Sequence, residues 1–339
     1  MGLSVVTVCM NRREHLLATV ARLAAWPHHD EHLIVDWSSR TPLRREELPA
    51  DPRLRLLRVE GEDRWNLCRA YNFGLARARG GRLLKLDADA WPTARFDPDD
   101  PRLRLGDGGP VCAFGSGPEG RKGQILIDAA LLAAVGGFHE LMVGYGFDDK
   151  DLQARLTSHC GQGPARLPED WLEVIEHGDE ERAGQGRARR RSGLEMAQGQ
   201  AAMRASRRAN RLVAAHCPWR PTSPASRYRE ETPGLWRLAE GSLPRPPAGV
   251  AAELRHERRM TFWGALLAIP EVCLEVLPYS LFPPSRDGRW PVRWWHRLWW
   301  HTGRRLVLLP VGALVGGRAA IEALRGRGGG AAAGRPEAP

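Results

Sequence analysis

The sequence predicts an α/β fold, with a mostly parallel sheet that carries helices on both faces and a mainly α-helical C-terminal region after it. Three observations lead to this prediction. Strand and helix signals alternate over the first 160 residues, an apolar run ends in the acidic stretch "LDADA", and the composition changes after about residue 182. Alternation of this kind favours parallel strands that are covered by helices.

Short apolar runs predict the strands. "SVVTVCM" (4–10) is β-branched and apolar, which is typical of a buried strand. Further runs of this character occupy residues 32–37, 54–59 and 82–90. Ligands of parallel sheets collect at the carboxyl ends of the strands, where we expect Asp36, Asp87 and Asp89.

Apolar residues at helical spacing predict the helices. "REHLLATVARLAAW" (13–26) shows this spacing, and "NLCRAYNFGLARARG" (66–80) shows it again before ending at Gly80-Gly81, a typical C-terminal stop. A third helix is predicted to begin in "FDDKDLQARL" (147–156). Acids at a helix N-terminus are favoured by its dipole, so a purely structural role for Asp148 and Asp149 stays open.

Composition indicates a folded protein with an affinity for anions. The chain has 339 residues, of which 42% are hydrophobic and 27% charged, and its formal net charge is +10. This balance predicts attraction to phosphate groups. The six cysteines are scattered, and we interpret them as reduced thiols of a cytoplasmic protein. The N-terminal residues read as a strand rather than a signal peptide, so we do not expect export.

Two aspartates one residue apart predict a cation site. Side chains at i and i+2 of a strand point to the same side, so Asp87 and Asp89 repel each other unless a cation lies nearby. A hard divalent ion relieves that repulsion and recruits phosphate oxygens. We therefore expect Asp89 on a metal and Asp87 on the metal or on a ribose. The alternative is a polar strand end whose acids cap the next turn.

Three further segments carry a family resemblance. "CMNRREHL" (9–16), "WNLCRAYNFG" (65–74) and "GGFHELMVGYGFDDKDLQARL" (136–156) resemble, in this order, motifs of the β-1,4-galactosyltransferase family. With the Asp-x-Asp, the segment 3–182 is similar to GT-A fold glycosyltransferases of the family-2-like type. The resemblance implies a Rossmann-like GT-A domain and a metal-dependent, inverting transfer of a sugar.

The resemblance also implies roles for single residues. Asp149 is the implied catalytic base, with acceptor contacts from Tyr145, Gly146 and Asp148. His177 lies where the family has a histidine metal ligand, so Asp89 and His177 together would hold Mn²⁺ or Mg²⁺, although a lone histidine is more often a surface or packed residue. In the family, position 148 is more often Glu and position 145 more often Trp.

Donor contacts are expected from residues near the strand ends. Asp36 is a candidate for the nucleobase or ribose, and Arg12 and Arg69 suit phosphate oxygens because a guanidinium donates through a planar fork. Trp65 is a candidate for stacking on the base. Each of these residues also has an ordinary structural alternative as a capping acid, a helix-surface arginine or a core tryptophan.

The C-terminal third is rich in tryptophan and arginine. "RWPVRWWHRLWWHTGRR" (289–305) favours the headgroup layer of a bilayer, and the apolar runs 261–282 and 306–317 are too short or too interrupted to cross one. We interpret 255–325 as an amphipathic, membrane-associating region, with a helical subdomain packed on the catalytic domain as the alternative. We do not expect nucleic acid as a partner.

These observations predict four regions and one activity. Residues 1–182 form a GT-A catalytic domain, 183–254 an Arg/Pro-rich helical and linker region, 255–325 the membrane-associating region and 326–339 a disordered tail. The predicted enzyme is a galactosyltransferase-like hexosyltransferase that uses a UDP-sugar and a glycan or lipid-linked glycan acceptor at the inner face of the cell membrane. A polyprenyl-phosphate glycosyltransferase and a non-catalytic membrane- or RNA-binding scaffold remain alternatives.

Overall fold

A mostly parallel sheet forms the centre of the protein. The structure, a computed structural model, describes residues 2–117, 120–175 and 193–252, with a few single positions further on. Within these residues the main sheet has nine strands, in the order β10-β11-β3-β2-β1-β4-β7-β6-β8. Its strands are β1 (Leu3–Cys9), β2 (Glu31–Trp37), β3 (Leu54–Glu60), β4 (Arg82–Asp87), β6 (Cys112–Gly115), β7 (Ile125–Asp128), β8 (Ala165–Leu167), β10 (Tyr228–Thr232) and β11 (Leu235–Leu238).

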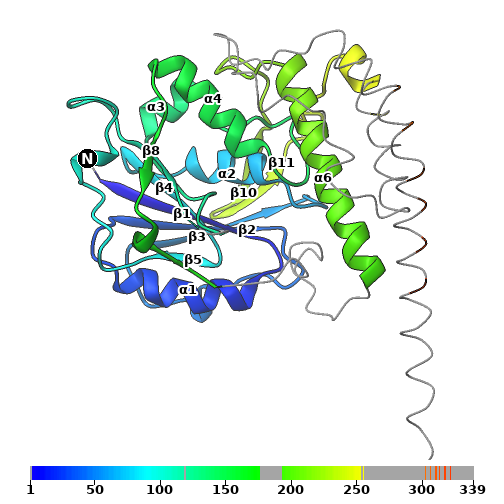
Figure 1. Cartoon of the computed structure of the whole chain (residues 1–339). Helices are drawn as coiled ribbons and strands as arrows, with labels where there is room; N and C mark the ends of the chain where they lie inside the picture. Colours follow the sequence, from blue (N-terminus) through cyan, green and yellow to red (C-terminus); the bar gives the residue numbers. More distant parts are fainter. Residues whose placement is uncertain are drawn as a thin grey trace, which may run out of the picture. The chain divides into compact units, whose positions relative to one another are not determined.

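Helices cover both faces of this sheet, as predicted. Figure 1 shows α1 on one face and α2 and α4 on the other. The helices of the described residues are α1 (Arg13–Ala25), α2 (Leu67–Leu75), α3 (Ala129–Ala134), α4 (Asp148–Cys160) and α6 (Gly193–His216). A separate antiparallel pair joins β5 (Ala90–Pro92) to β9 (Leu172–Val174), and short 3₁₀ turns occupy Arg45–Glu47, Pro101–Leu103 and Glu169–Trp171.

Strand register places the predicted site residues at one edge. β1 pairs in parallel with β2 and with β4, with Cys9 opposite Asp36 and Val8 opposite Asp87. Because parallel strands end at the same edge, the carboxyl ends of β1, β2 and β4 lie side by side. The strands predicted over 4–10, 32–37 and 54–59 are confirmed as β1 to β3. The strand predicted over 82–90 is confirmed as β4 only as far as Asp87, because Ala90 already belongs to β5.

The helix predicted over 66–80 is shorter than expected and ends at Leu75. Gly80 explains the early end, because the chain there runs against the start of β1. A Cβ atom on Gly80 would lie 2.6 Å from both Gly2 O and Ser4 N. The backbone must therefore leave the helix in time to enter β4 beside β1.

The segment 183–254 contains two strands of the main sheet, where the sequence predicted a helix and a linker. β10 and β11 form an antiparallel hairpin, and β11 pairs in parallel with β3. β10 lies at the sheet edge and is largely exposed, so polar and charged residues dominate it, and β11 has only four residues; no long apolar run marks either as a strand. The predicted helical part is present as α6.

The chain divides into two compact units. The first takes in Met1–Glu176 and Pro218–Pro246, and the second takes in His177–Cys217, including α6. In the part of the chain that the structure describes, no helix is both long enough and apolar enough to span a membrane. Most of the predicted membrane-associating region 255–325, and the whole tail 326–339, lie outside the described residues, so both interpretations stay predictions.

We expect Gly74→Val to lower the stability of the fold. A Cβ atom on Gly74 would lie 2.8 Å from Val6 Cγ1 and 3.2 Å from Val35 Cγ2, because α2 packs closely on β1 and β2. Overpacking of this kind costs about 1–3 kcal/mol, which urea unfolding of the full chain would measure. Gly163→Val is the matched control, since the nearest atom to its Cβ is Thr157 Oγ1 at 3.9 Å. Equal losses in both variants would contradict the close-packing argument.

Candidate active site

Asp87, the last residue of β4, is held by three side chains. Lys85 Nζ and the Tyr71 hydroxyl both donate to Asp87 Oδ1, over 2.8 and 3.0 Å. Gln124 donates from Nε2 to Asp87 Oδ2 over 2.9 Å and accepts from the Asp87 backbone N–H over 2.8 Å. The side chain remains 36% exposed. Asp87 is therefore both oriented and accessible to a ligand.

Lys85 is a cation buried beneath this carboxylate, with only 2% of its surface exposed. Its ammonium also donates to Gly123 O over 2.7 Å and lies 4.5 Å from the centroid of the Tyr71 ring. Burial lowers the pKa of Lys85, but the charges of Asp87 and Asp149 outweigh burial, so that the pKa is raised above its ordinary value. The side chain is thus a stable positive charge at the base of the site.

Gly123 marks the point where β4 and α4 meet. A Cβ atom on Gly123 would lie 3.4 Å from Asp87 Oδ2, 3.5 Å from Lys85 Nζ and 3.7 Å from Asp149 Oδ2. Two carboxylates from distant parts of the sequence therefore surround one point. Because position 123 is glycine, no side chain stands between these groups.

Asp149 lies in the first turn of α4, beside Asp148. The helix follows Phe147, which has the left-handed backbone angle φ 77°. Burial, reinforced by the charge of Asp148, raises the pKa of Asp149 to about 8. Burial likewise raises the pKa of Asp148. Asp149 Oδ1 is buried and has no hydrogen-bond partner among the described residues. A carboxyl group of this kind is suited to proton transfer.

A third acid in the same turn has a structural role. Asp151 is buried and forms an ion pair with Arg155, whose Nη2 lies 2.8 Å from Asp151 Oδ2. Arg155 also donates through Nη1 to Val135 O and Gly137 O, over 2.7 and 2.8 Å. Asp151 therefore fixes the loop before α4, and a charge-paired acid of this kind is not available for chemistry.

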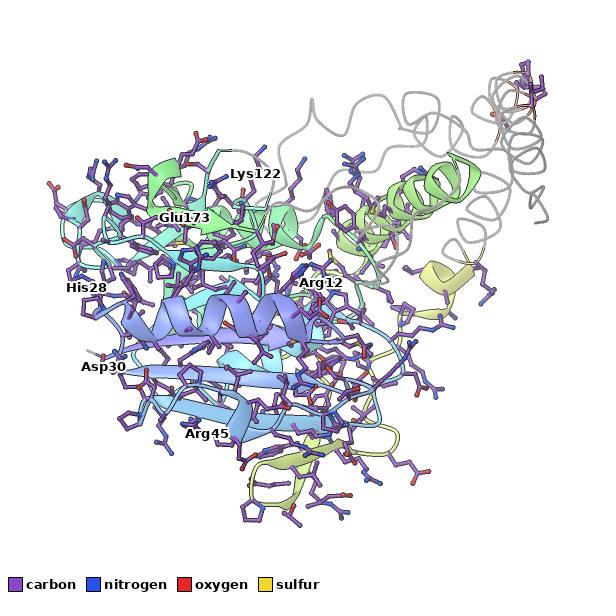
Figure 2. The ribbon with its side chains drawn as sticks, turned by 90° about the horizontal axis from the view of Figure 1, so that it is seen from below. Arg12, His28, Asp30, Arg45, Lys122 and Glu173 are labelled. Carbon is purple, nitrogen blue, oxygen red and sulfur yellow. The ribbon has the colours of Figure 1, made fainter. Side chains whose placement is uncertain are left out.

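Asp89 follows β4 and is nearly buried. Arg12, just before α1, donates from Nη1 to Asp89 Oδ2 over 3.2 Å. Figure 2 shows Arg12 at one end of α1, with His28 and Asp30 at the other. Ile175 donates its N–H to Asp89 O over 2.8 Å, so the chain that leads towards His177 runs beside Asp89 as far as Ile175. The hydrogen bond from Arg12 to Asp89 brings two of the predicted site residues into contact.

The second predicted metal ligand, His177, lies outside the described residues. Within the described ranges, no group of three or more His, Cys, Asp or Glu side chains is arranged to hold a metal ion. The carboxylate of Asp89 offers the oxygen ligand that a hard divalent cation prefers, and an imidazole beside it suits Mn²⁺. The Asp89 carboxylate therefore fits the predicted metal, and His177 as the second ligand stays a prediction.

Asp36 is engaged in the turn that follows β2. It accepts from Arg58 Nη1 over 2.6 Å and from the backbone N–H groups of Ser39 and Leu43 over 3.1 and 3.0 Å. Only 1% of the residue is exposed. These bonds give Asp36 the structural role of a turn-capping acid, and they occupy both of its oxygens.

Arg69 and Trp65 lie at the start of α2. Arg69 forms a two-point ion pair with Glu62, from Nη2 over 2.5 Å and from Nε over 3.2 Å, and the Tyr228 hydroxyl donates to Glu62 over 2.6 Å. The guanidinium of Arg69 is thereby bound to a carboxylate in this structure. Trp65 is half-buried. Arg69 lies on α2, the helix that also supplies Tyr71 to Asp87, and Trp65 lies two residues before this helix begins.

The predicted acceptor residues Tyr145 and Gly146 lie in a sharply turning loop. Gly144, Gly146 and Phe147 all have positive φ angles, of 80°, 82° and 77°. Glycine adopts such angles without strain, which accounts for two of the three residues. Tyr145 is 50% exposed. The loop therefore presents an aromatic ring at the surface within four residues of Asp149.

The structure brings together part of the predicted site. Asp87 and Asp149 meet at Gly123, and Asp89 meets Arg12, whereas Asp36 and Arg69 are bound in separate ion pairs. Sequence reasoning missed Lys85, Tyr71 and Gln124. A lysine inside an otherwise apolar strand was the one available signal, because an unpaired buried charge is costly.

We expect Asp149→Asn to stabilise the fold at alkaline pH. Because the pKa of Asp149 is raised in the folded state, its contribution to stability is fully present below about pH 4 and is lost as the pH rises through about 8. Asparagine does not ionise, so the variant avoids that loss. The urea midpoint of Asp149→Asn should exceed that of the wild type at pH about 9, and by less at pH about 5.

Asp107→Asn is the control for this measurement, since Asp107 is exposed. Its midpoint should differ from that of the wild type by the same small amount at both pH values. If the shift of Asp149→Asn were also independent of pH, Asp149 would not have a raised pKa in the fold.

Residues 4–98 match the family described as glycosyl transferase family 2. The matched segment includes β1 to β5 and both aspartates of the Asp-x-Asp. No curated protein sequence matches the chain significantly.

Three solved structures are similar to the chain at low sequence identity. The catalytic domain of Drosophila β1,4-galactosyltransferase 7, in complex with xylobiose, has 12% identity and a TM-score of 0.41, and the match covers 70% of this chain and 92% of that one. Mannosyltransferase PcManGT from Pyrobaculum calidifontis, in complex with GDP-Man and Mn²⁺, has 13% identity, a TM-score of 0.41, and coverage of 95% and 86%.

Glucosyl-3-phosphoglycerate synthase from Mycobacterium tuberculosis, in complex with Mn²⁺, UDP and glucosyl-3-phosphoglycerate, has 16% identity, a TM-score of 0.42, and coverage of 67% and 84%. Residues 4–98, which match glycosyl transferase family 2, also show the alternation of strands and helices that the sequence predicted.

Proposed function

We propose that the protein is a metal-dependent, inverting glycosyltransferase that moves a sugar from a UDP-sugar to a hydroxyl of a glycan or lipid-linked glycan. The observation that carries the proposal is the meeting of Asp87 and Asp149 beside Gly123. The family match of residues 4–98 supports glycosyltransferase chemistry. The transferred sugar is proposed to be a hexose, galactose by resemblance.

The donor is proposed to lie along the carboxyl ends of β1 and β4. Asp89 and His177 would hold Mn²⁺ or Mg²⁺, with Arg12 beside Asp89 as a phosphate contact. When bound, the divalent ion offsets the negative charge that grows on the leaving diphosphate. Asp87, which Lys85 and Gln124 orient, is proposed to accept hydrogen bonds from the sugar-nucleotide donor.

Asp149 is proposed to act on the acceptor. The acceptor oxygen attacks C1 of the sugar as the bond from C1 to the diphosphate oxygen breaks, and the hydroxyl proton passes to the Asp149 carboxylate. A base is most effective when its pKa lies near the working pH, which the raised pKa of about 8 satisfies. Asp148 and the loop of Tyr145 and Gly146 are proposed to contact the acceptor.

Removing a metal ligand should abolish metal-dependent donor use. We expect Asp89→Ala and His177→Ala each to lose Mn²⁺-dependent release of UDP from a UDP-sugar, measured across a panel of donors. His159→Ala, at an exposed histidine, is the matched control and should retain it. If the wild-type chain binds no nucleotide sugar in the presence of Mn²⁺, a non-catalytic scaffold is the better interpretation.

Removing the base should separate donor binding from transfer. We expect Asp149→Asn to lower kcat for transfer to a hydroxyl acceptor by about 10²–10⁴-fold, the usual contribution of a general base. Binding of UDP with Mn²⁺ should stay within about twofold of the wild type, and Asp107→Asn should change neither. Full transfer by Asp149→Asn would indicate an acceptor that needs no base, such as a polyprenyl phosphate.

A further inference from the structure

The loop that leads into the candidate site is bonded to α2 at both of its ends. Asn72 donates from Nδ2 to Phe138 O over 2.9 Å and accepts from the Phe138 N–H over 2.7 Å. Asn66 donates from Nδ2 to Met142 O over 3.1 Å. The backbone from 138 to 142 is therefore fixed to one helix immediately before the Tyr145 loop begins.

Glu140 lies at the centre of this fixed segment and is nearly completely buried (4% exposed). Its Oε1 accepts from Asn72 Nδ2 over 2.9 Å, and its Oε2 accepts from the Ser226 backbone N–H over 2.6 Å. One carboxylate therefore joins three parts of the chain: α2, the loop before α4, and the segment 219–228, which the sequence placed in a linker.

The segment 219–228 contacts the loop at two further places. Trp219 donates from Nε1 to Gly136 O over 2.7 Å, and its ring stacks on His139 with centroids 4.9 Å apart. A Cβ atom on Gly136 would lie 2.7 Å from the carbonyl of Arg220, so the two backbones pass in close contact. Tyr228, at the end of the segment, donates to Glu62.

Resting on the proposed function, we propose that Glu140 is a positioning residue for the acceptor: through Asn72 and Ser226 it holds the Tyr145 loop, and so the start of α4 with Asp149, in place. Both Glu140 oxygens bond groups outside the loop, and neither bond reaches the donor side at β4. Loss of Glu140 should therefore loosen the acceptor side and leave donor binding intact.

The test compares full-length Glu140→Ala and Glu140→Gln with the wild type. Hydrogen exchange of the amides in 143–149 should be about tenfold faster or more in Glu140→Ala, because a buried, charge-assisted pair of hydrogen bonds is lost. The acceptor KM should rise by a similar factor, while the dissociation constant of UDP with Mn²⁺ stays within about twofold. Glu140→Gln keeps one carbonyl acceptor and should give intermediate values, and it carries the test if Glu140→Ala does not fold.

Glu31→Ala is the matched control for general destabilisation. Glu31 is a buried carboxylate at the start of β2, the end of the strand away from the candidate site. It accepts from Ser4 Oγ over 2.5 Å and from the Arg79 N–H over 2.8 Å. Loss of Glu31 should leave hydrogen exchange of the amides in 143–149 no faster than that of the other amides in the first compact unit. Equal acceleration of 143–149 in both alanine variants would overturn the proposal.

Two other outcomes separate this proposal from the proposed function. Unchanged exchange in Glu140→Ala, or unchanged acceptor KM and kcat in a variant whose loop exchanges faster, would overturn the positioning role while the enzyme remains a transferase. If the wild type transfers no sugar but Glu140→Ala shows faster hydrogen exchange confined to 143–149, Glu140 does hold the loop and the proposed function is wrong.

Discussion

The candidate site depends on one buried positive charge, the ammonium of Lys85. An isolated charge in a protein interior costs several kcal/mol, so Lys85 is tolerated only with carboxylates close to it. Asp87 provides a direct contact, and Asp149 and Asp148 add their charges from α4. In turn, the cation offsets the repulsion among three acids that would otherwise oppose one another. Lys85 thus couples the end of β4 to the start of α4.

Helix α2 organises both sides of the site. Tyr71 reaches Asp87 on the sheet, while Asn66 and Asn72, on the same helix, hold the loop that precedes α4. Gly74 lets this helix lie close enough to β1 and β2 for these contacts to form. The end of β4 and the loop before α4 are therefore both bonded to the α2 region.

Asp149 has an environment different from that of three acids that hold the fold. Asp36, Asp151 and Glu62 are each bound to an arginine, and such pairs are costly to break once buried. Asp149 differs, because one of its oxygens is buried and has no hydrogen-bond partner among the described residues. Burial and the charge of Asp148 raise the pKa of this acid.

The sequence by itself determined the elements with strong apolar periodicity and the motifs that lie at their ends. β1 to β4, α1 and the start of α4 follow from local patterns, because burial of an apolar face dictates both the period and the length of such elements. The pair Asp87 and Asp89 was singled out by its place at the end of an apolar run, whereas Asp149 became a candidate only through the family resemblance.

Only the tertiary structure decided which of these residues meet. The partners of Asp87 lie on α2 and beside β7. The hairpin of β10 and β11 joins the sheet through backbone hydrogen bonds, which depend little on the side chains at these positions. Arg69 and Asp36 are residue types that often contact ligands, but in the structure Arg69 is bound to Glu62 and Asp36 to Arg58. The physical reason is that pairing of charges depends on distance in space, which local sequence patterns do not encode.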